Sequence, residues 1–376
     1  MRALVLVMLT LGWGCGRKEV IEGTEVDQHL SATQKAALTA LPDTFGPGAS
    51  RAMVPRGMPL LVQLDVKWLH EAGSWRPLIR AMASQSPGDL QQYEALVKSL
   101  GFDPFERVEQ LVMWSDVRNP DLAGGPGTRN GVLAQGKLPM AAVRDVLERE
   151  TRNMRIRTES AEMEAAGDIE MVLLTPMTAA EIETVVGVMA RDEVLTQKHR
   201  LRFGGREVLL ARIGRRTFLT VGWPGGLAIV LSRDARSPAD LAADLASRLT
   251  AAAAQSAPPA TVYFQVAFEA DSVTIDLPAG DPMAVRMQFS DGALGVDRAE
   301  VDTTVAAWPM VVADAGPTVD ELVGQMPALA PLKGELVAAL KSSTLTRAPG
   351  GQVQAQASIP RATLVALLKQ IPWDAL

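Results

Sequence analysis

The feature that most constrains the fold is a series of alternating apolar and polar segments joined by very short turns. The segments 207–213, 217–222 and 227–231 alternate in this way, and only residues 214–216 and the stretch around 224–226 separate them. Turns of this length connect antiparallel neighbours, whereas parallel strands need crossovers of a dozen or more residues. The pattern therefore predicts an α+β fold of antiparallel sheets with helices packed on one face.

The same alternation and the helix start signals predict the remaining elements. Further strands are expected over residues 61–66, 108–114, 154–162, 169–174, 262–268 and 285–289. Helices are expected where a capping residue precedes an apolar stripe of helical period, at Ser86, Thr178, Ser237 and Thr318. Asp291 and the glycine after it are typical of a hairpin turn.

The first fifteen residues have the pattern of an export signal. Arg2 is followed by the apolar stretch 3–11, and Gly14 stands directly before Cys15, which is the only cysteine. A bilayer takes about 20 apolar residues to cross, so this stretch predicts a cleaved leader and not an anchor helix. The small residue before the cysteine resembles the lipobox of bacterial lipoproteins.

That resemblance implies cleavage between Gly14 and Cys15, with acyl chains such as palmitate added to the thiol and to the new amine of Cys15. The chain would then be held in the cell envelope by its lipid. Gly16 is not the aspartate that retains lipoproteins at the inner membrane, so the resemblance favours the outer membrane. The alternative is an ordinary secretory signal, which would leave Cys15 as an unpaired, oxidisable thiol.

Composition divides the rest of the chain at two breaks. Residues 15–58 are polar and then rich in glycine and proline, which predicts a mostly disordered tether. Residues 250–259 are a run of alanines ending in two prolines. The predicted organisation is therefore a signal peptide (1–14), a tether (15–58), an α+β domain (59–252) and a second α+β domain (260–376).

The segments that follow the two breaks resemble each other. Residues 61–66 and 262–268 alternate alike, with a glutamine at the same outward position. Residues 132–139 and 353–360 each end a strand at a proline that suits the first turn of a helix. These matches favour two degenerate copies of one unit. Chance recurrence of strand, proline and helix is the alternative.

Charge and histidine spacing argue against two classes of function. The formal charge of −6 becomes about −7 once Arg2 is removed, and an acidic chain lacks the basic face that nucleic acids require. His29, His70 and His199 are far apart, and none has a zinc ligand a few residues downstream. We expect His199 in a basic loop, and we predict no metal and no other cofactor.

No pattern in the chain predicts a catalytic residue. The Gly-x-Ser-x-Gly elbow of hydrolases does not occur. Asp297, Glu300 and Asp302 come closest to a carboxylate cluster, but Arg298 among them would pair with one carboxylate and make it a poor general acid. We expect these residues on a solvated strand face.

The sequence thus predicts a non-enzymatic, membrane-anchored envelope lipoprotein that binds or scaffolds, with another envelope protein as its partner. Two alternatives stay open. A periplasmic carrier of lipid or another amphiphile would have an apolar cavity lined by strand residues such as Val62, Leu64, Phe264 and Val266. A hydrolase would bring scattered polar residues together in a cleft.

Overall fold

The computed structural model divides the chain into two compact units, both of which combine helices with a sheet. Unit 1 comprises Met1–Met58 and Pro87–Ala257, and unit 2 comprises Pro59–Ser86 and Pro258–Leu376. The structure describes residues 21–22, 32, 36, 39–46, 48–77, 94, 97–98, 103, 106–116, 128–141, 143–144, 167–191, 195–203, 206–213, 216–233, 238–255, 260–267, 272–278, 280–291, 297–348 and 351–370.

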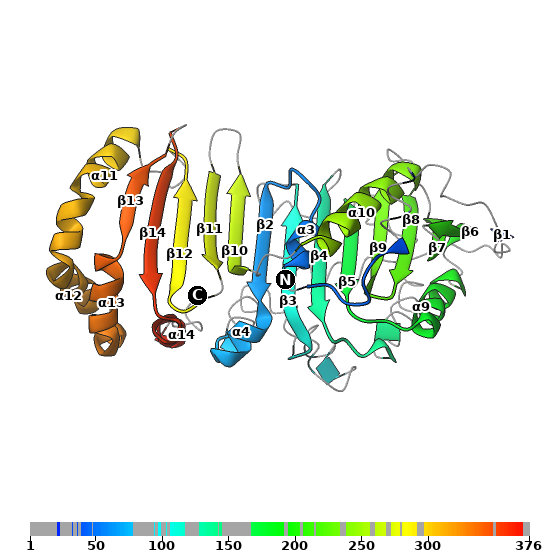
Figure 1. Ribbon diagram of the computed structural model, residues 1–376, viewed down its shortest axis with the longest axis horizontal. Coiled ribbons are helices and arrows are strands. Elements are labelled where there is room, and N and C mark those ends of the chain that lie inside the picture. Colours follow the sequence, from blue (N-terminus) through cyan, green and yellow to red (C-terminus); the bar gives the residue numbers. More distant parts are fainter. Residues whose placement is uncertain are drawn as a thin grey trace. The chain divides into compact units, whose positions relative to one another are not determined.

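Unit 1 is built on a mixed sheet with the strand order β1-β6-β7-β8-β9-β5-β4-β3 (Figure 1). Its strands are β1 (Ile21–Glu22), β3 (Val108–Ser115), β4 (Arg129–Gly136), β5 (Asp168–Leu174), β6 (Thr196–Phe203), β7 (Arg206–Ile213), β8 (Arg216–Trp223) and β9 (Gly226–Arg233). Its helices include α3 (Ala49–Ala52), α9 (Ala179–Arg191) and α10 (Pro238–Ala253).

The expectation of purely antiparallel sheets was wrong for unit 1. β4 and β5 pair in parallel, as do β1 and β6, while the other neighbouring pairs are antiparallel. The connection from Gly136 to Asp168 is long enough for the crossover that parallel strands need. The pairs β7–β8 and β8–β9, which short connections join, are antiparallel, as the sequence predicts.

Helices cover both faces of this sheet, which corrects the expectation of a single covered face. α9 packs on the face of the sheet to which a side chain at position 222 would point. A Cβ added to Gly222 would lie 2.4 Å from Ile182 of α9. α10 packs on the opposite face, because its Arg248 forms an ion pair with Glu170 of β5. Glu170 lies opposite Val230 in β9, and Val230 points to the face away from Gly222. Every residue of β8 is buried, and strands with apolar residues on both faces need cover on both.

Part of the segment expected to be a tether is folded in unit 1. Ser50 of α3 donates a hydrogen bond to Gln110 of β3 at 2.6 Å. The Met53 carbonyl accepts one from Arg248 at 2.7 Å, and the Met53 side chain is fully buried. The glycines and prolines around α3 therefore shape a packed connection here, which their composition alone did not distinguish from a flexible linker.

Gly131 of β4 provides a test of packing in unit 1. Its Cα lies opposite that of Trp114 in β3, and an added Cβ would lie 2.0 Å from the indole. We expect Gly131→Ala to destabilise the protein by about 1–3 kcal/mol, because the buried indole must move. Urea unfolding measures this change. Gly334→Ala in α13 is the control, since its added Cβ would meet nothing within 4 Å beyond the backbone of its own helix, and equal losses from both variants would contradict the prediction.

Unit 2 is built on an antiparallel sheet with the order β2-β10-β11-β12-β14-β13. Its strands are β2 (Leu60–Asp65), β10 (Ala260–Ala267), β11 (Ser272–Pro278), β12 (Met283–Phe289), β13 (Thr344–Arg347) and β14 (Val353–Ile359). Its helices include α4 (Val66–Glu71), α11 (Arg298–Ala313), α12 (Ala315–Gln325), the 3-10 helix η4 (Pro327–Leu332), α13 (Lys333–Lys341) and α14 (Arg361–Gln370).

The units differ from the sequence-based domains at residues 59–86. The sequence analysis assigns this segment to the first domain, whereas the structure groups it with the C-terminal part of the chain. The reason is that β2 pairs with β10, with Val62 opposite Phe264. Proximity along the chain could not show this pairing between distant segments.

Several expected elements are confirmed, including β3, β5, β7, β8, β9 and β12. The Thr178 capping box before α9 is also confirmed, because Thr178 donates from its N–H and its hydroxyl to Glu181 at 2.7 Å. These hydrogen bonds lower the pKa of Glu181. The strand expected at 154–162 and nearly all of the helix expected after Ser86 lie outside the described residues.

Three local expectations were wrong. His199 lies in strand β6, not in a loop, because β6 pairs with β7. Residues 297–302 begin helix α11, where Asp297 is the N-cap and accepts from the Glu300 N–H at 2.8 Å. Thr318 lies inside α12, which begins at Ala315. The residues that would complete a hairpin after Asp291 lie outside the described part of the chain.

Candidate binding site

The pairing register of unit 2 places apolar side chains on one face of its sheet. Residues directly opposite each other in antiparallel strands share a face. Phe264 lies opposite both Val62 and Ile275, and Ile275 lies opposite Met287. We define the apolar face as the even-numbered residues 60–64 and 262–266, together with the odd-numbered residues 273–277, 283–289 and 353–359.

The opposite face of the same strands is mainly polar. It carries Thr274 on β11, Arg286 on β12 and Gln356 on β14. A sheet with this pattern normally packs its apolar face on a core and leaves the polar face in water. The sequence of unit 2 therefore specifies which face of the sheet should be covered.

The apolar face is nevertheless incompletely covered. Only Met283 and Val353 of its members are buried, and the others are half-buried. In unit 1, by contrast, every residue of β8 is buried. A contiguous exposed apolar patch can mark a site for a ligand, a partner or a membrane, and this face is apolar throughout and partly exposed.

The described helices of unit 2 do not lie across the middle of the sheet. Figure 1 looks down the shortest axis of the structure, so a layer of helices packed on the strands would overlap them. The picture shows α11, α12 and α13 beside β13 and β14, and α4 and α14 near the ends of the strands. No described helix overlaps β10 or β11 in this view.

Helix α11 borders the apolar face along its β13 edge. Arg347 of β13 lies opposite Val353 and so points to the same side as the apolar face. Its guanidinium contacts Asp302 of α11 at 2.6 Å and Asp291 at 2.9 Å. Asp302, one of the three carboxylates considered from the sequence, is therefore held in an ion pair that fixes α11.

The border helices also expose apolar side chains. Met310 of α11 is 66% exposed, and Met326 after α12 is 47% exposed. Methionine is flexible and polarizable, so it adapts to irregular apolar surfaces. These two side chains add exposed apolar surface to unit 2.

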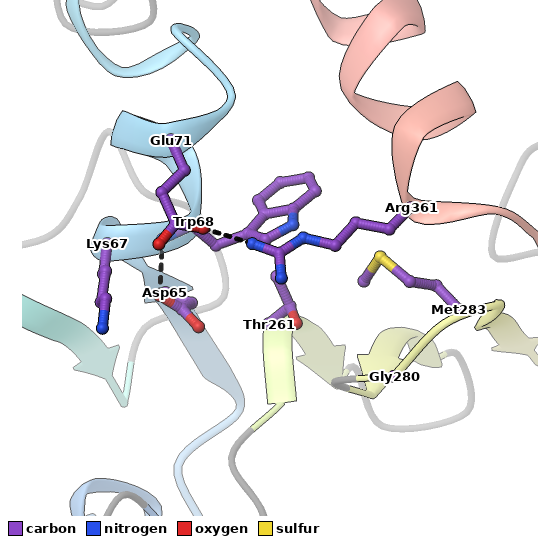
Figure 2. Close-up of a pocket in the computed structure, with 8 residues that line it drawn as sticks. All are labelled: Asp65, Lys67, Trp68, Glu71, Thr261, Gly280, Met283 and Arg361. Carbon is purple, nitrogen blue, oxygen red and sulfur yellow. Dashed lines mark hydrogen bonds and ion pairs between the residues drawn. The ribbon is translucent and has the colours of Figure 1, made fainter.

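A polar pocket lies at one end of the sheet of unit 2, where β2 ends and β12 begins (Figure 2). Its volume is about 220 Å³. Its lining consists of Asp65, Lys67, Trp68, Glu71, Thr261, Gly280, Met283 and Arg361. Met283, which is only 1% exposed, belongs to both the pocket lining and the apolar face.

Asp65 caps helix α4 and lines this pocket. One of its carboxyl oxygens accepts from the Trp68 N–H at 2.8 Å. Burial raises the pKa of Asp65 above its ordinary value, against the opposing effect of this hydrogen bond. Because the native state holds the proton more tightly than the unfolded chain, this group's contribution to stability decreases as pH rises from 3.8 through the raised pKa.

Two further groups define the chemistry of the pocket. The Trp68 side chain is only 5% exposed, and its indole N–H has no hydrogen-bond partner among the described residues. Arg361, at the start of α14, forms an ion pair with Glu71 of α4. The Trp68 indole is thus buried beside a pocket rim that carries charge.

The sequence analysis missed this pocket. It placed Val66 at the end of a strand, although Asp65 before Val66 and Lys67 is a residue that commonly caps helices. Recognising Asp65 as an N-cap would have placed Trp68 in the first turn of a helix. Nothing in the sequence indicated that Met283 and Arg361 would lie beside that turn.

A second polar cluster, in unit 1, has a structural role. Arg248 of α10 contacts Glu170 at 2.7 Å and Asp244 at 3.3 Å, and the Arg248 and Glu170 side chains are both under 10% exposed. The cavity beside them holds only about 10 Å³, which is no more than one water requires. This cluster fastens α10 to the sheet and leaves no room for a ligand.

The other residues considered from the sequence do not form a site. His70 lies in α4 and contacts the Trp75 ring at 5.7 Å between centroids, and His29 lies outside the described residues. Within the described ranges, no three His, Cys, Asp or Glu side chains gather as metal ligands would. Gly14 and Cys15 also lie outside the described residues.

Comparison with known proteins identifies no relative. No protein-family model matches the chain, and no curated protein or solved structure matches it either. Among the described helices, none combines the length and hydropathy needed to span a membrane.

Proposed function

We propose that this chain is a non-enzymatic lipoprotein of the bacterial cell envelope, and that unit 2 binds an amphiphile on its apolar face. The observation that carries the proposal is the half-buried state of nearly all apolar side chains on that face. Val62, Leu64, Phe264 and Val266, which the sequence suggested for a carrier, all belong to it. We therefore prefer an amphiphile carrier to a protein scaffold as the function of unit 2.

The chemistry of the face favours hydrocarbon as its occupant. Its members in β2, β10, β11, β12 and β14 are all apolar, so no charge or hydrogen bond is available there to select a protein partner. Burying apolar surface yields about 25 cal/mol per Å² whatever the shape of the apolar partner.

Native mass spectrometry of the protein isolated from its own envelope tests this proposal. We expect one amphiphile per chain, together with saturable uptake of a fluorescent hexadecanoate analogue after delipidation. A chain that carries no lipid and takes up none would overturn the proposal. So would a stoichiometric protein partner or a second copy of the chain that buries the apolar face.

The lipid anchor is a separate part of the proposal, and it rests on Cys15 after Gly14. We expect Cys15→Ala to move the protein from the membrane fraction to the soluble fraction, because acylation of the thiol and the amine anchors a protein far more firmly than one acyl chain. Fractionation followed by immunoblotting measures this shift. Thr24→Ala, in the same N-terminal region, should leave the protein on the membrane, and a membrane-bound Cys15→Ala protein would refute the anchor.

We also propose that the fold contains two degenerate copies of one unit. The offset between the matching segments in the sequence equates Val62 with Phe264, and these two residues lie directly opposite each other in β2 and β10. A local two-fold axis through that pair would relate the two strands. The second match is less regular, because β4 has a parallel neighbour and β14 has only antiparallel ones.

A further inference from the structure

The short stretch of chain between Cys15 and the first paired strand limits how far unit 1 can stand from a membrane. β1 begins at Ile21, which lies beside His199 of β6. Ile21 is six residues after Cys15. A fully extended chain spans at most about 3.6 Å per residue, so an acylated Cys15 holds β1 within about 22 Å of the membrane surface.

This link attaches to one particular end of the sheet of unit 1. β1, β6 and β7 are the first three strands in the order of that sheet, and β3 is the last (Figure 1). Neighbouring strands are about 4.8 Å apart, so β3 lies about 34 Å from β1 across the sheet. The end that carries β6 and β7 is therefore the end that Cys15 holds nearest the membrane.

The same end of the sheet is basic, although the chain as a whole is acidic. We define the basic edge as residues 16–22 together with β6 and β7. Leaving out Lys198, which is buried, the edge contains six basic and three acidic residues, a net charge of +3. The mature chain carries about −7, so about −10 remains outside the edge. The six basic residues are Arg17, Lys18, Arg200, Arg202, Arg206 and Arg212.

This distribution of charge favours one orientation at an anionic bilayer. Each lysine or arginine close to such a surface contributes about 1 kcal/mol of attraction, which falls off within about 8 Å at physiological salt. The acidic remainder of the protein is repelled by the same surface. The short link and the electrostatic attraction therefore bring the same end of unit 1 to the bilayer.

We propose that the basic edge of unit 1 lies against the bilayer that holds Cys15 and contacts its anionic lipid head groups. This inference rests on the lipid anchor in the proposed function, and it does not depend on amphiphile binding by unit 2. The residues that follow Cys15 then act as a short link that orients unit 1, with β3 at the end of its sheet away from the membrane.

Quenching of a fluorescent label by a nitroxide on the lipid head groups tests this orientation. Cys15 is the only cysteine and is acylated in the anchored protein, so an introduced cysteine is the only free thiol. Arg212→Cys labels the basic edge, and Arg107→Cys, directly before β3, removes the same charge at the other end of the sheet. Both side chains are exposed.

The labelled proteins are reconstituted into vesicles that contain phosphatidylglycerol. We expect quenching at position 212 to be at least about threefold stronger than at position 107, because about 24 Å of sheet separates β7 from β3. Equal quenching at the two positions would overturn the inference. A protein that does not stay with the vesicles would instead overturn the lipid anchor.

Two comparisons assign the orientation to charge. Replacing phosphatidylglycerol by phosphatidylcholine should lower the ratio of the two quenching signals at least about twofold, since the attraction needs an anionic surface. The double variant Arg200→Gln, Arg202→Gln should lower the ratio in the same way. Arg51→Gln, Arg56→Gln, at exposed positions in and after α3, is the matched control and should not. The vesicle comparison needs no further substitution, and a ratio that does not depend on phosphatidylglycerol would overturn the inference.

Discussion

Replacing Ile275 with aspartate is expected to reduce amphiphile binding about a hundredfold, because a carboxylate in contact with hydrocarbon loses its hydration without a compensating partner. Ile275 lies in the middle of the apolar face, opposite Phe264 on one neighbouring strand and Met287 on the other. Displacement of a fluorescent hexadecanoate analogue from the Cys15→Ala protein measures the loss. The change should appear with hexadecanol as well, since it acts on the tail.

Thr274→Asp is the matched control for this experiment. Thr274 precedes Ile275 on β11 and points to the opposite, polar face. The same charge introduced there should leave binding within about twofold of the parent protein. Thermal melts of both variants establish that they fold, and Ile275→Ser provides a milder change if the aspartate prevents folding. Equal losses at positions 274 and 275 would show that the ligand does not lie on the apolar face.

The second large effect is expected in unit 1. Replacing Arg248 with methionine leaves the Glu170 carboxylate buried without its guanidinium partner, and it removes the donor to the Met53 carbonyl. Removing one partner of a buried ion pair lowers the free energy of unfolding by about 3–5 kcal/mol. We therefore expect Arg248→Met to lower the free energy of unfolding of unit 1 by about that amount, measured by urea denaturation.

Two further variants make this prediction specific to the ion pair. The double variant Arg248→Met, Glu170→Leu should recover most of the loss, since replacing both partners by apolar residues removes the uncompensated charge. Arg191→Met, at the exposed end of α9, should change stability by less than about 0.5 kcal/mol. A double variant no more stable than Arg248→Met alone would contradict the explanation.

The elements that the sequence predicted correctly are those with a local signal. Thr178 and Glu181 are three residues apart, so their capping box could be recognised without knowing what α9 packs against. The alternation in β7, β8 and β9 and the short turns between them likewise specify antiparallel neighbours. By contrast, β6 and α11 were misassigned, since the polar and charged residues around His199 and Asp297 carry no clear period.

For the candidate site, the sequence predicted its apolar half and not its polar half. Val62, Leu64, Phe264 and Val266 were identified because their alternation places them on one face of each strand. The pocket brings together Asp65, Met283 and Arg361, which come from three distant parts of the chain. No periodicity links such residues, so only their positions in the folded unit could show them as neighbours.

The sequence by itself determined which side chains of each strand share a face, because the strand repeat of two residues is fixed by backbone geometry. It also determined the start of α9 at its Thr178 capping box, although not the start of α12. Only the tertiary structure decided that β2 joins β10, that β4 runs parallel to β5, and that the apolar face of unit 2 stays partly open. Those outcomes depend on the packing of segments far apart in the chain, which local sequence patterns do not reveal.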